Sequence, residues 1–264
     1  MWRQNMEKAM WYGIGKRMYK DLDSRYIEIF EMLRMGRTPE LDGEGKKPDL
    51  RSLLIEYGNY RIKQEFTEDQ AAIKVAAVRE EMDQLINKYY EKCLAFAIPF
   101  DLKVTSDPCA YFRQGSTIDG ISELFSYGSK MCDFRGQLDE RVKEMARQIL
   151  PNTTALVGER LAMDLLVHAH GLKRLAYMPS SSIQMLGAER ALFTAIQKRG
   201  NTPKYGVLFK YPKLSTLRPR QRGKIARIIA NKVAITARAD LLGTKVDAES
   251  FREKIDNMIK SSKK

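Results

Sequence analysis

The sequence predicts an all-α protein, a helical bundle in which an antiparallel, coiled-coil-like helix pair precedes a second helical domain. Apolar residues recur at intervals of three and four through most of the 264 residues, which is the spacing of one face of an α-helix. Proline and glycine stand between these stretches, where helices usually begin and end. No stretch shows a strong strand pattern of alternating apolar and polar residues. We therefore expect three parts, residues 1–66, 67–150 and 151–264.

The amino-terminal part is predicted to consist of helices on either side of a loop. Residues 5–33 have helical spacing, because their first apolar residues recur every four positions. These residues are Met10, Ile14, Met18 and Leu22. Residues 36–49 crowd glycine, proline and acids together without an apolar period, which indicates a loop. A shorter apolar stretch, Leu53 to Ile62, follows.

Two long helices are predicted between residues 67 and 150. Thr67 and Gln70 form a capping-box pattern at the start of the first, where each side chain can satisfy a free backbone donor. Apolar residues then follow at the intervals of a coiled-coil seam. They are Ala71, Val75, Val78, Met82, Leu85 and Tyr89 in the first helix, and Met131, Phe134, Leu138, Val142, Met145 and Ile149 in the second. Proline and glycine in the link between the helices predict that the second folds back against the first.

The apolar stripes of this pair allow two structural interpretations. They can belong to the core of one helical bundle, or they can form an arm through which residues 67–150 of two copies make a homodimer. Charged replacements at Val78 and Met82 distinguish the two, because they produce a monomer only if the seam is intermolecular.

The carboxy-terminal part, residues 151–264, is predicted to contain several short helices and one long one. The first begins after Pro151, with Asn152 as its N-cap. A further helix runs from about Gly187 to Lys198. The short apolar run at residues 207–209 is compatible with an extended segment.

The basic residues are concentrated in this last part. Residues 184–238 contain thirteen Lys or Arg and a single acid, Glu189. Residues 151–264 hold 22 basic and 8 acidic residues, whereas residues 1–150 hold 24 and 25. Because the excess charge lies in one half, we expect a polyanionic partner, with nucleic acid as the first candidate.

One long helix, from Pro219 to about Leu242, is predicted to display much of this charge. Proline suits the first turn of a helix, and Gly243 suits its end. Its cations lie within about 40° of Arg220 around the helix axis, and its apolar residues lie on the opposite side. The cations are Arg220, Lys224, Arg227 and Arg238, and the apolar residues are Ile225, Ala226, Ile229, Val233 and Ala237. Nearby, Tyr211 is expected to stack on bases at the surface, and Phe209 is expected in the core.

Other observations exclude several classes of protein. Cys93, Cys109 and Cys132 lack the spacing of metal ligands and follow no signal peptide, so we expect neither a disulfide framework nor a zinc site, and a reducing compartment. No apolar run approaches the roughly 20 residues that cross a bilayer. Both tryptophans, Trp2 and Trp11, lie outside the basic half, so no membrane partner is expected. We predict a cytoplasmic protein.

Six runs in the last part resemble a known family. They resemble the Nop domain of the core proteins of archaeal and eukaryotic box C/D ribonucleoproteins, and of a related spliceosomal pre-mRNA processing factor. The runs are PNTTALVGERLA (151–162), GLKRLAYMPSSS (171–182), IQMLGAERALF (183–193), TPKYG (202–206), RGKIAR (222–227) and ITARADLLG (235–243). The resemblance covers about the last 110 residues. Because no lysine- and glutamate-rich tail follows, an archaeal source is expected.

This resemblance implies an all-helical scaffold without a catalytic activity or cofactor of its own. It would dock on a kink-turn RNA that already carries a small ribosomal-type protein, and it would support 2′-O-methylation of rRNA or tRNA. In box C/D particles, the family also recruits a fibrillarin-like methyltransferase, and a coiled coil before the Nop domain pairs two copies.

The resemblance also implies which residues meet the partners. Gln184, Gly187, Ala188, Glu189 and Arg190 would face the composite surface of RNA and protein, with Gly187, Ala188 and Glu189 toward the protein. Lys204, Lys210, Arg222, Lys224 and Arg227 would meet phosphates. The charge pattern adds Arg218 and Arg220 to the RNA-binding set, and Tyr211 is added as a stacking residue.

Two alternatives remain beside the scaffold. The first is a general RNA-binding paralogue that recruits no methyltransferase, because residues 1–66 do not match the methyltransferase-binding domain of the family. The second is an enzyme that uses His168 and Asp164, which can pair at a spacing of four. His170 points about 200° away from His168 on a helix, and no nucleophile elbow or phosphate loop accompanies them. We therefore expect no enzyme and no metal.

Overall fold

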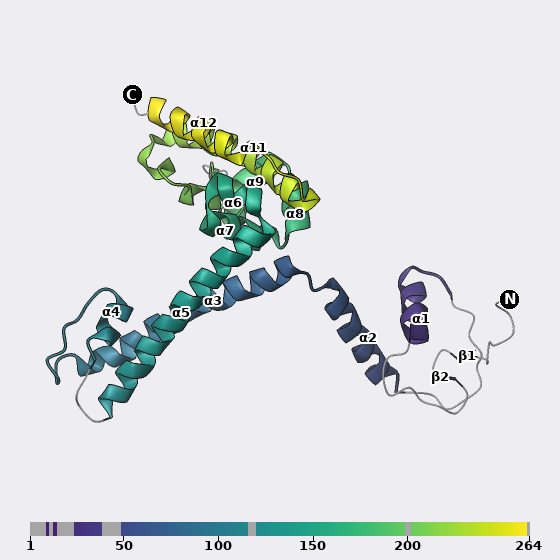
Figure 1. Ribbon diagram of the computed structural model, residues 1–264, viewed down its shortest axis with the longest axis horizontal. Coiled ribbons are helices and arrows are strands. Elements are labelled where there is room, and N and C mark those ends of the chain that lie inside the picture. Colours follow the sequence, from purple (N-terminus) through teal and green to yellow (C-terminus); the bar gives the residue numbers. More distant parts are fainter. Residues whose placement is uncertain are drawn as a thin grey trace. The chain divides into compact units, whose positions relative to one another are not determined.

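The computed structural model describes residues 9–10, 13–14, 24–38, 49–115, 120–198 and 202–262. These residues are predominantly helical, which confirms the all-α class (Figure 1). The chain divides into two compact units, Met1–Thr67 and Glu68–Lys264.

The first unit contains a short strand pair and two helices. Strands β1 (Ala9–Met10) and β2 (Gly13–Ile14) pair antiparallel, with Ala9 opposite Ile14. The predicted helix over residues 5–33 is therefore wrong at Met10 and Ile14, and Met18 and Leu22 lie outside the described residues. Glycine at position 13 is a poor helix former, which favours the hairpin over the four-residue spacing. The helix in this region, α1, spans Ser24–Arg34.

Helix α2 (Leu50–Glu65) packs against α1 through a small aromatic cluster. The rings of Phe30 and Tyr57 are 4.8 Å apart. The carboxylate of Glu31 accepts hydrogen bonds from the Tyr57 hydroxyl and from Arg61, each at 2.8 Å. The hydrogen bond from Tyr57 holds the pKa of Glu31 below its usual value. The predicted apolar stretch from Leu53 to Ile62 is thus one helix of this unit.

The second unit begins with the predicted antiparallel pair, formed by α3 (Glu68–Cys93) and α5 (Ile121–Ile149). Arg79 of α3 contacts Asp139 of α5, and ten residues later the Tyr89 hydroxyl donates to the carbonyl oxygen of Leu124 at 3.1 Å. Because the partner numbers decrease as the α3 numbers increase, the helices run in opposite directions, side by side in Figure 1. In the sequence, η1 (Leu94–Phe96) and α4 (Pro108–Arg113) lie between α3 and α5.

The seam between these helices follows the predicted stripe only in part, because Val142 of α5 is buried and Tyr89 of α3 bonds across the pair, whereas buried positions of α3 such as Ala72 lie one residue after predicted ones. The buried residues of α3 are Ala72, Ile86 and Cys93, while Val78 and Leu85 of the predicted seam are about half exposed. Phe134 on α5 is also exposed. Polar residues such as Arg79 occupy part of the seam, where ion pairs satisfy them, so on α3 the apolar pattern indicated a face about 100° from the buried residues.

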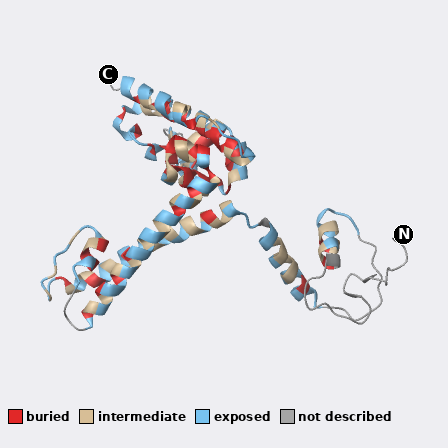
Figure 2. Ribbon diagram, viewed as in Figure 1, coloured by how far each residue is buried: buried red, intermediate tan, exposed pale blue. Residues whose placement is uncertain are grey.

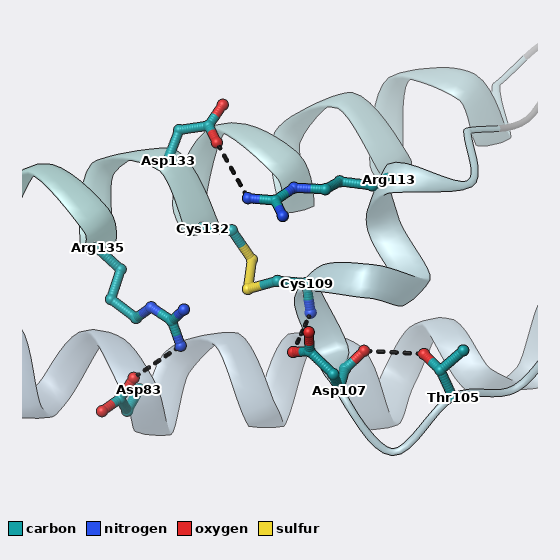
Figure 3. Close-up of a disulfide and its surroundings, with 8 residues drawn as sticks. All are labelled: Asp83, Thr105, Asp107, Cys109, Arg113, Cys132, Asp133 and Arg135. Carbon is teal, nitrogen blue, oxygen red and sulfur yellow. Dashed lines mark hydrogen bonds and ion pairs between the residues drawn. A yellow bond between two sulfur atoms is a disulfide. The ribbon is translucent and has the colours of Figure 1, made fainter.

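A disulfide joins α4 to α5, contrary to the prediction that the cysteines form no disulfide. Cys109 and Cys132 are bonded, with Cα atoms 5.8 Å apart (Figure 3). Asp107 accepts a hydrogen bond from the Cys109 amide at 3.1 Å and so caps α4. The two cysteines are 23 positions apart in the sequence, and it is the packing of α4 against α5 that brings them together, which local spacing does not predict. Cys93 is buried with a free thiol.

The rest of the second unit is a bundle of shorter helices around α11, and most of the buried residues lie there (Figure 2). Its elements are α6 (Pro151–Val157), α7 (Glu159–Ala169), α8 (Leu172–Tyr177), α9 (Ser180–Met185), α10 (Glu189–Gln197), η2 (Val207–Lys210), η3 (Leu214–Thr216), α11 (Pro219–Leu242) and α12 (Ala248–Ser261). Residues 207–209, expected to be extended, belong to the 3-10 helix η2.

Asp240, near the end of α11, joins this helix to the start of α6. Its carboxylate accepts hydrogen bonds from the amides of Asn152 and Thr153 at 2.8 and 3.0 Å, and from the Thr153 hydroxyl at 2.6 Å. A carboxylate at this position also complements the positive end of the α6 dipole. Asn152 is therefore not the N-cap that we predicted. It lies inside α6, and its side chain bonds Val246 and Thr244.

Candidate nucleic-acid interface

Helix α11 has the two faces that its sequence predicts. Ile225, Ala226, Ile229, Val233 and Ala237 are all buried against the bundle. On the opposite side, Arg220, Lys224, Arg227 and Asn231 are exposed. The helix begins at Pro219 and ends at Gly243 in the left-handed conformation, as expected. A rigid apolar anchor thus holds a row of cations toward solvent.

The loop that carries Lys204 is fixed to α9. The side-chain amide of Gln184 donates to the carbonyl oxygen of Lys204 at 2.6 Å, and the Gly206 amide donates to the carbonyl oxygen of Gln184 at 2.9 Å. A Cβ atom at Gly206 would lie 1.9 Å from the carbonyl oxygen of Leu186, so only glycine fits. Gln184, predicted to contact RNA, therefore has a positioning role.

Lys204 lies against the first turns of α11. Its side-chain Cδ is 3.6 Å from the place where a Cβ of Gly223 would be, so its stem lies over Gly223, the residue before Lys224. Together, Lys204, Arg220, Lys224 and Arg227 form what we call the α11 cation cluster. Among the described residues, none of the four has an ion-pair partner.

Other predicted phosphate contacts are engaged within the protein. Lys210 pairs with Asp164 at 2.7 Å between Nζ and Oδ2. Arg222 donates from Nε to the carbonyl oxygen of Leu217 at 2.6 Å, and from a terminal nitrogen to that of Ser215 at 2.7 Å. Arg222 thus closes the turn before α11. Lys210 is therefore paired with a carboxylate, and Arg222 is bonded to backbone carbonyl oxygens, before any phosphate binds. Arg218, the N-cap residue of α11, is exposed.

The exposed aromatic residue is Phe209, and the prediction for Tyr211 is wrong. Tyr211 is 3% exposed, and its burial raises its pKa to about 12. Leu208, Tyr211, Leu214 and Leu217 are all buried, with the three-residue period of a 3-10 helix. Because this period turns Tyr211 inward, it turns its neighbours outward.

Phe209 instead takes part in a stack at the surface. It is 40% exposed, and its ring lies 5.2 Å from that of Tyr205 with the planes 10° apart. The guanidinium of Arg222 lies 5.7 Å from the centre of the Phe209 ring. Tyr205, Phe209 and Arg222 therefore form a layered group on which a nucleobase can stack. The sequence contains this signal as two aromatic residues before Lys210, but we expected Phe209 to lie in the core.

The residues predicted to contact a protein partner lie between α9 and α10. Gly187 has φ of +80°, and its amide donates to the carboxylate of Glu189 at 2.7 Å. Burial opposes the ionisation of Glu189, but the amides of Gly187 and Glu189 and the nearby histidines still lower its pKa. Helix α10 begins at Glu189, two residues later than predicted. Arg190 is exposed.

Helix α10 itself buries none of its residues. Phe193 is 66% exposed, and Ile196 is exposed as well. Two large apolar side chains are thus exposed on one short helix, directly after the predicted protein contact.

The residues considered for catalysis are not assembled into a site. Asp164 pairs with Lys210, and His170 ends α7 in the left-handed conformation while its carbonyl oxygen accepts a hydrogen bond from Gln70 at 3.1 Å. Within the described ranges, no three potential ligands could hold a metal ion. No helix there is long and apolar enough to cross a membrane.

A family model described as "Nop: snoRNA binding domain, fibrillarin" matches residues 111–262. Nucleolar protein 58 of Schizosaccharomyces pombe is 37% identical over 153 residues, which are 56% of this chain and 30% of that protein. Nucleolar protein 56 of Mus musculus is 36% identical over 150 residues, covering 54% and 26%. A chain in the crystal structure of a fibrillarin/Nop5p complex shares the fold with a TM-score of 0.55 and 24% identity, covering 97% of this chain and 99% of that one.

The chain spans less than a third of the length of the curated relatives that it matches. Those relatives are nucleolar proteins by name, so the prediction of a cytoplasmic location is wrong. The prediction failed because the lack of a secretion signal does not distinguish the cytoplasm from the nucleus.

Proposed function

Because this chain belongs to the Nop family, we propose that it is the RNA-binding scaffold of a box C/D-type ribonucleoprotein. It recognises a kink-turn RNA together with the ribosomal-type protein bound to that RNA, and it catalyses no reaction itself. In this role it supports the 2′-O-methylation of rRNA or tRNA by a separate enzyme.

The α11 cation cluster is the observation that carries this proposal. Lys204, Arg220, Lys224 and Arg227 are exposed within a few helical turns, and Glu189 is the sole acid between Asp164 and Asp240 in the sequence. Like charges held this close repel one another in the free protein. A polyanion removes that repulsion and gains the release of its own counterions. Phosphates of a folded RNA fit this surface best.

The layered group and α10 add recognition beyond phosphate. Phe209 and Tyr205 offer a stacking face for an unpaired base, which a kink supplies and a regular duplex does not. We assign Gly187, Ala188 and Glu189, followed by the exposed Phe193, to contacts with the RNA-bound protein. Helix α9, which holds the loop of Lys204, is followed directly by the α9–α10 connection and the exposed apolar residues of α10. One surface of the protein can therefore contact both the RNA and the protein bound to it.

A fibrillarin-like methyltransferase is a further proposed partner. The description of the family model names fibrillarin, and the solved chain that shares this fold comes from a complex with fibrillarin. The likeness of fold covers nearly the whole chain, including parts outside residues 111–262. This supports recruitment over the alternative of a general RNA-binding paralogue.

We also propose that two copies pair through the α3–α5 arm. Val78 and Leu85 each precede a seam residue on α3, and Tyr127 and Phe134 do so on α5; all four are exposed. One residue corresponds to about 100° of rotation around a helix. Because the two helices run in opposite directions, this displacement puts both exposed stripes on the same side of the pair. The result is one apolar surface along the arm, as a second copy requires.

The proposed function is tested by binding a kink-turn RNA to the full chain with and without its ribosomal-type protein. We expect the ternary complex to form at far lower protein concentration than the binary one, because α10 contributes only when the protein is present. Equal affinities in the two cases would favour the general RNA-binding paralogue. A methyltransferase or nuclease assay of the purified chain is expected to show no turnover.

A further inference from the structure

We propose that α8 carries a second RNA contact, which takes a single-stranded segment next to the folded RNA. The site consists of Tyr177 with Arg174 and Arg238. It deepens the proposed function, because it assigns a class of ligand to a surface outside the α11 cation cluster.

Tyr177 is the most informative residue of this surface. It is the last residue of α8, and 73% of it is exposed to solvent. The two residues before it, Leu175 and Ala176, are buried, so the helix is anchored through them while the tyrosine ring projects outward. A ring this exposed contributes little to the core. It offers a flat apolar face of the kind that binds unpaired bases by stacking.

Arg238 brings a cation to the same place. Its Nε donates to the carbonyl oxygen of Ala176 at 3.0 Å, so the guanidinium lies at the end of α8, beside the backbone of Tyr177. Arg174 and Lys173 are exposed one turn earlier, on the face of α8 that also carries Tyr177. A cation at the carboxyl end of a helix is favourable in itself, which accounts for Arg238. It does not account for the two further cations or for the exposed ring.

Among the described residues, no ion pair engages Lys173, Arg174 or Arg238, and the carboxylate of Asp69, which accepts from the Leu172 amide at 2.7 Å, lies at the opposite end of α8 from Tyr177. The sequence has no acid between Asp164 and Glu189, so α8 and α9 contain none. The nearest acid along α11 is Asp240, and its oxygens are bonded to Asn152 and Thr153. An aromatic face among unbalanced cations is the composition of surfaces that bind single-stranded nucleic acid. Tyrosine and arginine are common in protein–protein interfaces as well, but the surplus of positive charge from Lys173, Arg174 and Arg238 favours a polyanion here.

The position of Arg238 on α11 indicates which part of an RNA would reach this site. Arg238 lies on the same side of α11 as Arg220, because eighteen residues correspond to five whole turns. The two are about 27 Å apart along the helix axis. Helix α8 packs beside α11 in this region. RNA bound at the α11 cation cluster therefore reaches Tyr177 if it continues along the helix, and because stacking on the exposed ring requires an unpaired base, a single-stranded flank of the folded RNA is the ligand.

The test compares two RNAs on the full chain in the presence of the kink-turn protein. One is a blunt kink-turn RNA, and the other carries a ten-uridine extension, which is tested at the 5′ end and at the 3′ end in separate RNAs. We expect the better-placed extension to increase affinity about tenfold, which equals the contribution of about one stacked base. Tyr177→Ala is expected to remove this gain and to leave binding of the blunt RNA unchanged. Tyr177→Phe, which keeps the ring, should retain the gain.

The outcomes separate this inference from the proposed function. If the blunt RNA binds but neither extension adds affinity, or if Tyr177→Ala keeps the gain, the α8 site is refuted and the proposed function stands. If Tyr177→Ala weakens the blunt complex as much as the extended one, Tyr177 contacts the protein or the folded RNA, which also refutes the site. If the chain does not bind the blunt RNA at all, the proposed function fails. Binding of a fluorescein-labelled uridine dodecamer then tests the α8 site by itself. Tyr177→Ala must weaken this binding severalfold, and Tyr177→Phe must not.

Discussion

Arg79 of α3 donates a hydrogen bond from Nε to the carboxylate of Asp139 on α5, at 2.6 Å, in the middle of the antiparallel pair. Asp83 accepts from a terminal nitrogen of the same guanidinium at 2.5 Å and pairs with Arg135 of α5 at 3.4 Å. An ion-pair network thus occupies the central turns of an otherwise apolar seam. Such a network fixes which residues lie opposite one another, because any slip leaves charges without partners.

Replacement of Asp139 by Asn is expected to destabilise the arm in a pH-dependent way. Burial opposes its ionisation, but the hydrogen bond and charge of Arg79 hold the pKa of Asp139 below its usual value. A carboxyl group with a lowered pKa adds stability above its unfolded pKa of 3.8, and this is lost as the pH falls through the lower folded value. At neutral pH we expect a loss of about 2 kcal/mol in the free energy of unfolding, measured by denaturant titration. The difference from the unmodified chain should shrink below about pH 4; a pH-independent difference would contradict this account.

The structure of α11 could be predicted from its sequence because each of its faces is defined by residues close together in the chain. Pro219, Gly243 and the apolar spacing determine its ends and its buried side, and the exposed side follows from the helix geometry. The seam of the arm could be predicted in this way only in part, for residues such as Val142. Arg79 belongs in it only because Asp139, sixty residues away, lies opposite, and no local pattern contains that pairing.

The candidate site shows the same division. The exposed cations of α11 were predicted, since local spacing suffices for them. Lys210 was assigned to phosphate, but Asp164 neutralises it from 46 residues away. Tyr211 was assigned to the surface because its neighbours are polar, whereas the 3-10 geometry of residues 207–210 turns it inward. The disulfide required knowledge that α4 folds back onto α5.

The disulfide is expected to stabilise the end of the arm. It joins two cysteines that are 23 positions apart in the sequence, and by restricting the unfolded chain it should add about 3 kcal/mol to the free energy of unfolding. Cys132→Ser should lower the free energy of unfolding by about this amount. A thiol reductant should bring the unmodified chain to the value of the variant and leave the variant unchanged. Equal stability of the unmodified chain with and without reductant would show that the bond does not form.

The two aromatic residues around Lys210 are expected to have opposite roles. Tyr211→Ala should lower the free energy of unfolding by about 3 kcal/mol, because it empties a buried site. Phe209→Ala should change stability little but weaken binding of the kink-turn RNA about tenfold, by removal of a stacking face. Thermal unfolding and RNA titration of both variants provide the measurements. If a stably folded Tyr211→Phe variant bound RNA more weakly while Phe209→Ala bound RNA normally, Tyr211 and not Phe209 would be the residue that contacts RNA.

The phosphate contacts are expected to differ between cations with and without a carboxylate partner. Lys224→Ala should reduce the slope of log affinity against log salt concentration by about one, because one phosphate contact is lost. Lys210→Ala is the matched control, since Asp164 already neutralises its charge. For this variant we expect an unchanged slope. If both variants change the slope equally, the ion pair with Asp164 does not persist in the complex.

The exposed stripe on the arm is expected to hold two copies together. Val78→Glu introduces a charge into this stripe, one residue from the seam between α3 and α5, so it should disrupt a dimer without unfolding the pair. Gln84→Glu adds the same charge on the far side of α3, about 160° from the seam residue Ile86, and is the matched control. Light scattering should report a dimer for the unmodified chain and for Gln84→Glu, and a monomer for Val78→Glu. Because the seam of each pair remains intact, the helix content of all three should be equal. A monomeric unmodified chain, or a dimer that survives Val78→Glu, would assign the stripe to some other contact.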